Sequence, residues 1–545
     1  MFIVPSRALP VWLHPYKYQV KGWKDTDAEV DTINGEEAIA VGHTDTTADD
    51  EESKRNLRDQ LRRTLSSKRS NSNVSSQRRK GKQPDIAVQP SETVVVASFY
   101  PPREYFVLTD AGKPVFTSRP EGEDSDTLSS TMGIIQALIS VFLDDSDKLR
   151  CINAGKLRIT FLLRSPLYYV CASSWGEPES VTRSHLEYLH LQILSVVTAA
   201  QLRRIFERRT NFDLRRLLNG AENFLFSLLS RMEFDLAMAT SSLHCLRLDS
   251  TLRTRVAESL IPITKMKDIL YIILSAQGRV ITLVRPKKHS IHPADIHILM
   301  NTIHSPSIFN SPASASWIPV CLPKFNPSGF VNAYISFLRR ASDAVPPEVI
   351  GRSSQSDVEG RDEDRLAPNA SEPDSAISLV CISGGGDFET VRGWCDTVTA
   401  KLDNEGILDA ISKAVHTGLT EYSVSELGVP GLRHFVYKSR PHVQITVPLF
   451  EEPYDNLNER RRIVTLYQTL HDAIHAKSGQ EETLKLQYIL TENESVMGWI
   501  TQPFELYIAL SPRIPKSAVI GAANAVVRWI KKEEGRLFLR DAPVF

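Results

Sequence analysis

The sequence predicts an α/β fold built as three α+β sandwiches in tandem. One pattern recurs three times after about residue 93: a strand, a tight turn, a second strand, a helix, three further strands and a closing helix. A turn between two β-rich runs is typical of a hairpin, and the helix that follows each hairpin indicates a small sandwich of helices and sheet. The chain has 545 residues, 42% of them apolar, and is long enough to bury three or four separate cores.

Module one opens with strands from Glu104 to Thr109 and from Val115 to Thr117, joined by a turn at Asp110–Lys113. A helix from Leu128 to Leu143 follows. The next apolar runs predict strands at Leu149–Ile152, Leu157–Leu163 and Leu167–Ala172, a long helix at about Val181–Arg208 and another at about Leu214–Phe234.

Modules two and three repeat this order. Module two has predicted strands at Asp268–Ser275, Val280–Val284, Trp317–Leu322, Phe330–Phe337 and Ile377–Ile382, with helices at about Pro293–His304 and Phe388–Leu402. Module three has predicted strands at Leu432–Lys438, Val443–Val447, Leu484–Thr491, Val496–Ile500 and Phe504–Leu510, with helices at about Glu459–Ala476 and Lys516–Lys532.

These elements divide the chain into four regions. Residues 1–92 are expected to be a disordered tail, acidic first and basic later, because they hold too few apolar residues to offset the entropy of ordering. The modules are predicted at 93–240, 241–416 and 417–545. A proline-rich acidic stretch at 341–375 is expected to be a disordered insertion, because module two still lacks its last strand and helix at that point.

The basic part of the tail indicates binding to a negatively charged surface. Between Lys54 and Lys82 the sequence has eleven Lys and Arg residues and one acidic residue, Asp59. Attraction to an anionic phospholipid membrane contributes about 1 kcal/mol per basic residue near the surface; the alternative is a solvated tail without a partner. Nucleic acid is not expected, because aromatic residues for base stacking are absent here. The candidate membrane-contact residues are Lys54, Arg55, Arg58, Arg62, Arg63, Lys68 and Arg69.

The remaining composition indicates a cytosolic protein. The six cysteines form no C-x-x-C pair and lie mostly in apolar patterns, as expected for reduced core thiols. No run approaches about 18 consecutive apolar residues, and prolines interrupt the apolar N-terminus, so neither a membrane span nor a signal peptide is expected. Any contact with a membrane is therefore predicted to be peripheral.

Two motifs resemble reactive sites without completing them. His471 and His475 have the i, i+4 spacing of a zinc-binding helix, but no motif marks a third ligand, so no metal is expected. Gly384–Gly386 lies between a strand and a helix but lacks the Lys-Ser/Thr of a phosphate loop, which favours a simple turn. No catalytic residue and no cofactor site is predicted.

The helix from Leu128 to Leu143 is apolar on two sides. One stripe contains Met132, Ile135 and Ile139, and a second contains Ile134, Leu138 and Val141. A helix that is apolar nearly all round needs cover on both sides. Its own sheet covers one, and the other is covered either by another helix of this chain or by a partner.

Several blocks of the sequence together resemble the SAND family, which supplies the Mon subunit of the Mon–Ccz complex. The resemblance covers about residues 100–545 apart from the acidic insertion, and it does not include the tail. The matching blocks are Asp110–Phe116, Met132–Phe142, Asn211–Leu218, Val320–Phe325, Leu432–Lys438 and Arg528–Glu534.

The resemblance implies three longin domains and a role in guanine-nucleotide exchange. The expected partners are a Ccz-type subunit, itself of three longin domains, the Rab GTPase of late endosomes and vacuoles (Rab-seven/Ypt-seven type), and an anionic phospholipid membrane that includes a phosphoinositide. An upstream early-endosomal Rab is a further expected partner. Exchange is expected only from the assembled heterodimer. Candidate residues for the GTPase or partner interface are Ile134, Leu138, Val141, Leu149 and Cys151.

Such a protein is expected to be cytosolic and recruited peripherally to late endosome, vacuole or lysosome and autophagosome membranes, with roles in endosome maturation, vacuole fusion and autophagy. Two other function classes stay open. Longin domains also build non-catalytic adaptors and tethers in membrane trafficking, and these would not stimulate nucleotide release. A metal hydrolase that uses His471 and His475 would contain bound zinc.

Overall fold

A computed structural model describes residues 100–540 apart from 120–124, 145–146, 148, 263–265, 267, 311–314, 339–376 and 479–483. The predicted tail at 1–92, the insertion at 341–375 and all the basic tail residues lie outside the described residues. Residues 133–149 belong to a different compact unit from the surrounding 99–132 and 150–545.

The first sheet confirms the hairpin pattern of module one. Its strand order is β2-β1-β5-β4-β3, and all neighbours are antiparallel. The strands are β1 (Glu104–Thr109), β2 (Pro114–Thr117), β3 (Cys151–Ala154), β4 (Leu157–Arg164) and β5 (Leu167–Ser173). Helix α4 (Glu179–Val196) packs on β4 and β5. Helix α3 (Ser125–Asp144) includes the whole range predicted for it.

The long helix predicted from Val181 to Arg208 is wrong, because the chain forms two helices there. Helix α4 ends at Val196, Val197 is extended with φ −127°, and α5 (Ala199–Arg208) begins after Thr198. The Thr198 side chain accepts a hydrogen bond from the Gln201 amide, and the Ala199 amide donates to Pro327 of module two. A capped N-terminus and an outside acceptor replace the bonds that a continuous helix would have made.

The single helix predicted at Leu214–Phe234 is also wrong. The chain forms α6 (Arg215–Leu218) and α7 (Glu222–Phe234), separated at Gly220, where φ is +85°. That left-handed conformation costs glycine little and cannot continue a right-handed helix. Helix α7 is followed by a short α8 (Leu236–Ala239), which Asp235 caps by accepting hydrogen bonds from two backbone amides.

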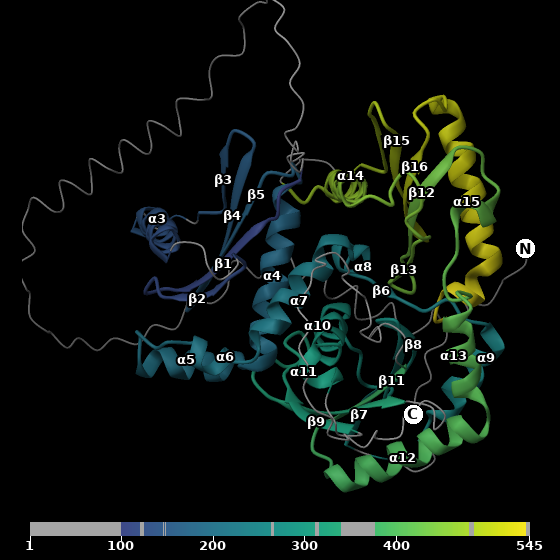
Figure 1. The fold of residues 1–545 in the computed structure, drawn as a ribbon, viewed down its shortest axis with the longest axis horizontal. Coiled ribbons are helices and arrows are strands. Elements are labelled where there is room, and N and C mark those ends of the chain that lie inside the picture. The colour runs from purple at the N-terminus through teal and green to yellow at the C-terminus, as the bar shows by residue number, and fades with distance from the viewer. Residues whose placement is uncertain are drawn as a thin grey trace, which may run out of the picture. The chain divides into compact units, whose positions relative to one another are not determined.

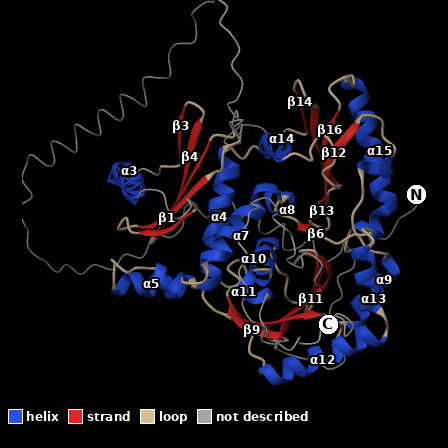
Figure 2. Cartoon of the chain, in the orientation of Figure 1, coloured by secondary structure: helices blue, strands red, loops and turns tan. Residues whose placement is uncertain are grey.

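The second sheet has the same topology, with order β8-β7-β11-β10-β9; its strands β9 and β11 are labelled in Figure 2. Its strands are β7 (Ile269–Ala276), β8 (Arg279–Val284), β9 (Ala315–Val320), β10 (Val331–Leu338) and β11 (Ile377–Ser383). The helices are α9 (Ser250–Ser259), α10 (Pro293–Ile303), α11 (Pro306–Phe309), α12 (Phe388–Asn404) and α13 (Ile407–His416). Of these, α10 and α12 were predicted, and the shorter three were not.

The third sheet repeats the topology and adds one strand. Its order is β14-β15-β16-β12-β13-β6. The strands are β12 (Leu432–Ser439), β13 (Gln444–Thr446), β14 (Leu486–Leu490), β15 (Ser495–Ile500) and β16 (Phe504–Leu510), with helices α14 (Leu457–His475) and α15 (Lys516–Leu537). Strand β6 (Leu243–His244) pairs in parallel with β13, so residues assigned by sequence to module two complete the sheet of module three.

Three helices, one from each module, meet around α7. Helix α7 packs against α4, α10 and α14, and α10 also packs on α4 (Figure 1). A buried polar network joins them. The Asn301 amide donates to Gln192 Oε1 at 2.9 Å and to the Phe224 carbonyl at 2.8 Å, and Ser227 donates to Asn301 Oδ1 at 3.0 Å. Gln192 and Asn301 are fully buried, so these bonds fix the relative register of the helices.

Candidate functional site

Helix α3 exposes a long surface without charged side chains. Between Asp126 near its start and Asp144 at its end, no residue is ionisable. Ile135 and Ile139 are buried, whereas Ile134 is 59% exposed, and Leu138 and Val141 are half-buried. The two stripes seen in the sequence therefore differ in accessibility, and Ile134 lies on the accessible one. Exposed apolar surface of this kind marks sites of interaction with proteins or membranes.

The same helix passes a test for a membrane-spanning helix, although the count of consecutive apolar residues predicted no such span. From Asp126 to Asp144 it is long and apolar enough to cross a membrane by length and composition alone. Only a small part of this stretch is buried within the structure. Polar residues such as Gln136 and Ser140 interrupt the run, which is why no long unbroken apolar stretch appears in the sequence.

Strand β3 carries one of the two remaining interface candidates. The predicted strand began at Leu149, but the pairing begins at Cys151, opposite Thr160. Leu149 is buried at 6% exposure, so its side chain is not available to a partner. Cys151 is partly exposed. Strand β3 ends its sheet, with β4 as its one neighbour among the described strands, and an end strand presents backbone groups to which another strand can pair.

The two histidines of α14 meet a third potential ligand that no motif marked. His471 and His475 lie one turn apart on α14, and Glu505 projects toward them from β16. His475 Nε2 is 3.1 Å from Glu505 Oε2, and His471 Nδ1 is 3.9 Å from the same oxygen. The signal in the sequence was a single acidic residue inside an otherwise apolar strand, but only the packing of β16 under α14 gives it a partner.

Hydrogen bonds set the protonation of this cluster. Lys477 Nζ donates to His471 Nε2 at 3.0 Å, so His471 carries its proton on Nδ1 and donates to the Tyr507 hydroxyl at 2.7 Å. Tyr507 in turn donates to Glu505 at 3.3 Å. Burial, reinforced by the charge on Lys477, holds the pKa of His471 well below its ordinary value.

Glu505 is an ionised carboxylate in this environment. Burial opposes its charge, but the hydrogen bond from His475 and the ion pair with Lys438 at 3.3 Å outweigh that effect and lower its pKa to about 2. Lys438 also donates to the Thr240 carbonyl at 2.9 Å, which fixes the ammonium beside Glu505 Oε1.

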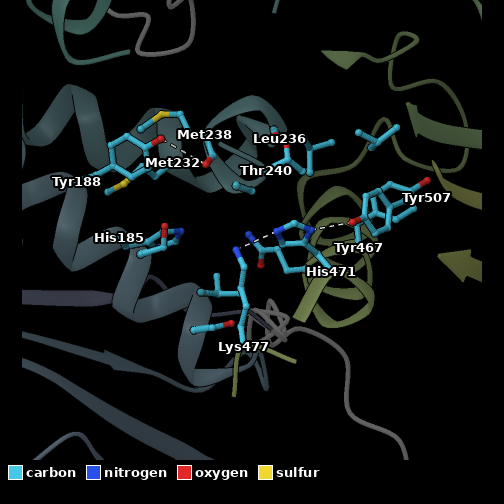
Figure 3. Close-up of a pocket in the computed structure, with 16 residues that line it drawn as sticks. His185, Tyr188, Met232, Leu236, Met238, Thr240, Tyr467, His471, Lys477 and Tyr507 are labelled. Atoms are coloured by element: carbon cyan, nitrogen blue, oxygen red, sulfur yellow. Dashed lines mark hydrogen bonds between the residues drawn. The ribbon is translucent and has the colours of Figure 1, made fainter. Parts of the chain in front are cut away.

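A small cavity, open to solvent, lies beside this cluster. His185 and Tyr188 of α4 line one side, and His471 and Tyr507 of module three line the other (Figure 3). Gln468 also lines it; this residue is 3% exposed, and its Oε1 has no hydrogen-bond partner in the described structure. The cavity is a feature of the contact between modules one and three, and no prediction from the sequence had located it.

Comparison with known families identifies the three modules. Residues 103–228, 267–358 and 431–534 match family models described respectively as the first, second and third Longin domain of FUZ, MON1 and HPS1. The matches follow the order of the three sheets, so the repeated sandwich is the longin fold.

Similar proteins cover most of the chain. "Vacuolar fusion protein MON1" of Cryptococcus neoformans is 49% identical over 82% of this chain and 66% of its own length. "Vacuolar fusion protein MON1 homolog A" of Gallus gallus is 36% identical over 80% of this chain and 72% of its own, and "Protein SAND" of Takifugu rubripes is 34% identical over 80% and 76%. The chain thus spans about two thirds of the Cryptococcus relative. With three longin domains and this extent of identity, the chain belongs to the MON1/SAND family of vacuolar fusion proteins.

Proposed function

We propose that this chain is one subunit of a heterodimeric guanine-nucleotide exchange factor. Its partner is a Ccz-type subunit of three longin domains, and its substrate is the Rab GTPase of late endosomes and vacuoles. Membership of a family of vacuolar fusion proteins supports a role at that compartment. The observation that carries the proposal is the accessible apolar side of α3, since Ile134 is 59% exposed on a helix without ionisable residues between its ends.

Exchange asks for no covalent chemistry from this chain. A protein that binds the empty GTPase more tightly than the nucleotide-bound form weakens nucleotide binding by the same factor, because the two affinities are linked. The contacts need only compete for the switch segments and the magnesium site of the GTPase. An apolar helix face suits this role, because surface of this kind is stabilised by burial against another protein.

Two elements of module one are the proposed contacts. Helix α3 supplies Ile134, with Leu138 and Val141 on the same side. Strand β3, with Cys151, supplies an end strand to which a strand of the partner can pair. Leu149 is withdrawn from the proposed contacts because it is buried.

The basic tail completes the proposal as the membrane contact. Lys54 to Arg69 would draw the complex to anionic phospholipid, including a phosphoinositide, so that the cytosolic heterodimer acts on a membrane-bound GTPase. Peripheral recruitment of this kind agrees with the vacuolar role of the relatives.

The test is nucleotide release from the GTPase. The chain is co-expressed with its Ccz-type subunit, the purified complex is mixed with the late-endosomal GTPase carrying a fluorescent GDP, and release is followed after excess GTP is added. Stimulated release from the complex, absent with either subunit alone and with an early-endosomal GTPase as substrate, is the expected result. A complex that assembles and binds the GTPase without accelerating release would instead be a trafficking adaptor or tether.

A further inference from the structure

We propose that His471, His475 and Glu505 form a binding site for one zinc ion between α14 and β16. The two histidines share one side of α14 because they are four residues apart, and Glu505 faces them from the strand beneath. Two imidazoles and one carboxylate are a ligand set that zinc uses in proteins. The inference rests on this geometry alone and is independent of nucleotide exchange.

The distances fit a tetrahedral ion. With bonds of about 2.0–2.1 Å, the ligand atoms of a tetrahedral zinc site lie about 3.3 Å apart. Glu505 Oε2 is 3.1 Å from His475 Nε2 and 3.9 Å from His471 Nδ1, and all three ligand atoms lie within 4.8 Å of one another. The Tyr507 hydroxyl lies 2.7 Å from His471 Nδ1 and 3.3 Å from Glu505 Oε2, so its hydrogen bond with Nδ1 is given up when the ion binds.

The surroundings hold the ligands in place. The second oxygen of Glu505 is fixed by Lys438, which leaves Oε2 for the ion. Outer contacts of this kind orient metal ligands and are part of most zinc sites. Glu505 and His471 are buried, whereas the His475 side chain is 26% exposed, so an ion has a route in from solvent.

Two ammonium groups lie beside the site: Lys438 pairs with Glu505, and Lys477 competes with the ion for His471. When zinc occupies Nδ1 of His471, Nε2 must carry the proton, and a charged Lys477 can no longer donate to it. Lys477 lines the cavity beside His471, and its ammonium must turn away from His471 before the ion can bind. The ammonium also repels a divalent ion, so its removal should tighten binding by roughly tenfold or more. A structural ion pair network without a metal would show no such gain.

The experiment uses the full chain, stripped with a chelator and titrated with zinc against a chromophoric zinc indicator. The wild type should bind one equivalent, and His475→Ala and Glu505→Gln should bind at least about tenfold more weakly, because each removes one of three protein ligands. Lys477→Gln should bind more tightly than the wild type. His416→Ala, which removes an exposed histidine of α13 far along the sequence, is the matched control and should bind as the wild type does.

Cobalt supplies the second measurement. Four-coordinate cobalt absorbs visible light strongly, so the wild type loaded with cobalt should be coloured and His475→Ala colourless. Thermal melting of the metal-free variants shows whether each is folded, and His475, being partly exposed, should tolerate the change. The proposal is overturned when folded His475→Ala binds zinc as tightly as the wild type, or when the wild type takes up no stoichiometric zinc.

Discussion

Two isoleucines on the same helix should separate partner binding from folding. Ile134 is 59% exposed and Ile139 is fully buried, and both lie in α3. In the isolated chain, Ile134→Asp should cost only about 0.5 kcal/mol through lower helix propensity. Ile139→Asp should cost about 4 kcal/mol or more, because it removes a buried aliphatic side chain and buries an unpaired charge.

The substitution Ile134→Asp, which should cost little stability, should have a large effect on partner binding. If a partner covers Ile134, the substitution removes about 1–2 kcal/mol of apolar burial and adds the cost of desolvating a carboxylate. A total of about 3–5 kcal/mol corresponds to binding weakened roughly 10²- to 10³-fold or more. Circular dichroism melting of the single chain and a pull-down with the Ccz-type subunit or the GTPase measure the two effects. An Ile134→Asp chain that melts normally and binds both proteins as the wild type does would refute this interface.

Three further outcomes are expected. Asn301→Ala should destabilise the fold by about 3–5 kcal/mol in chemical denaturation, since Gln192 Oε1 then stays buried without a partner, whereas exposed Asn310→Ala should have little effect. Burial lowers the pKa of His434 to about 3 and of His190 to about 4. The unfolded chain therefore binds more protons below pH 6.5, and the melting temperature should fall from pH 6.5 to about 4; a flat profile would contradict it. Deletion of residues 54–82 should abolish the salt-sensitive part of binding to anionic liposomes, and unchanged binding would exclude the tail as the contact.

The hairpins were predictable because their signals are local. In modules one and two a glycine-containing turn separates two β-rich runs, and the structure places strands there within a residue or two of the prediction. The breaks in the helices were harder to see. Thr198 ends α4 by capping the next helix, and its neighbour Ala199 bonds to Pro327, more than a hundred residues away. A periodic apolar pattern that runs across such a break still looks like one helix.

The candidate sites were also only partly predictable from the sequence. The two apolar stripes of α3 follow from residue spacing and could be predicted from the sequence. The sequence did not predict which of the two stripes is exposed. Leu149 was predicted as a residue of the GTPase or partner interface, but its side chain is buried. Glu505, the third member of the histidine cluster, lies 30 residues beyond His475 and meets it only through the packing of β16 on α14.

The sequence by itself determined the number of modules and the order of their main strands, and its matching blocks indicated the family. The number of modules and the order of their strands depend on turn residues and on apolar periodicity, which act between near neighbours, whereas the family was indicated by particular blocks of residues. The tertiary structure alone decided that β6 joins the third sheet, that Asn301 and Gln192 link helices of two modules, and that two histidines face a carboxylate. Each of these contacts joins residues far apart along the chain, and its geometry is set by packing among whole elements rather than by local preference.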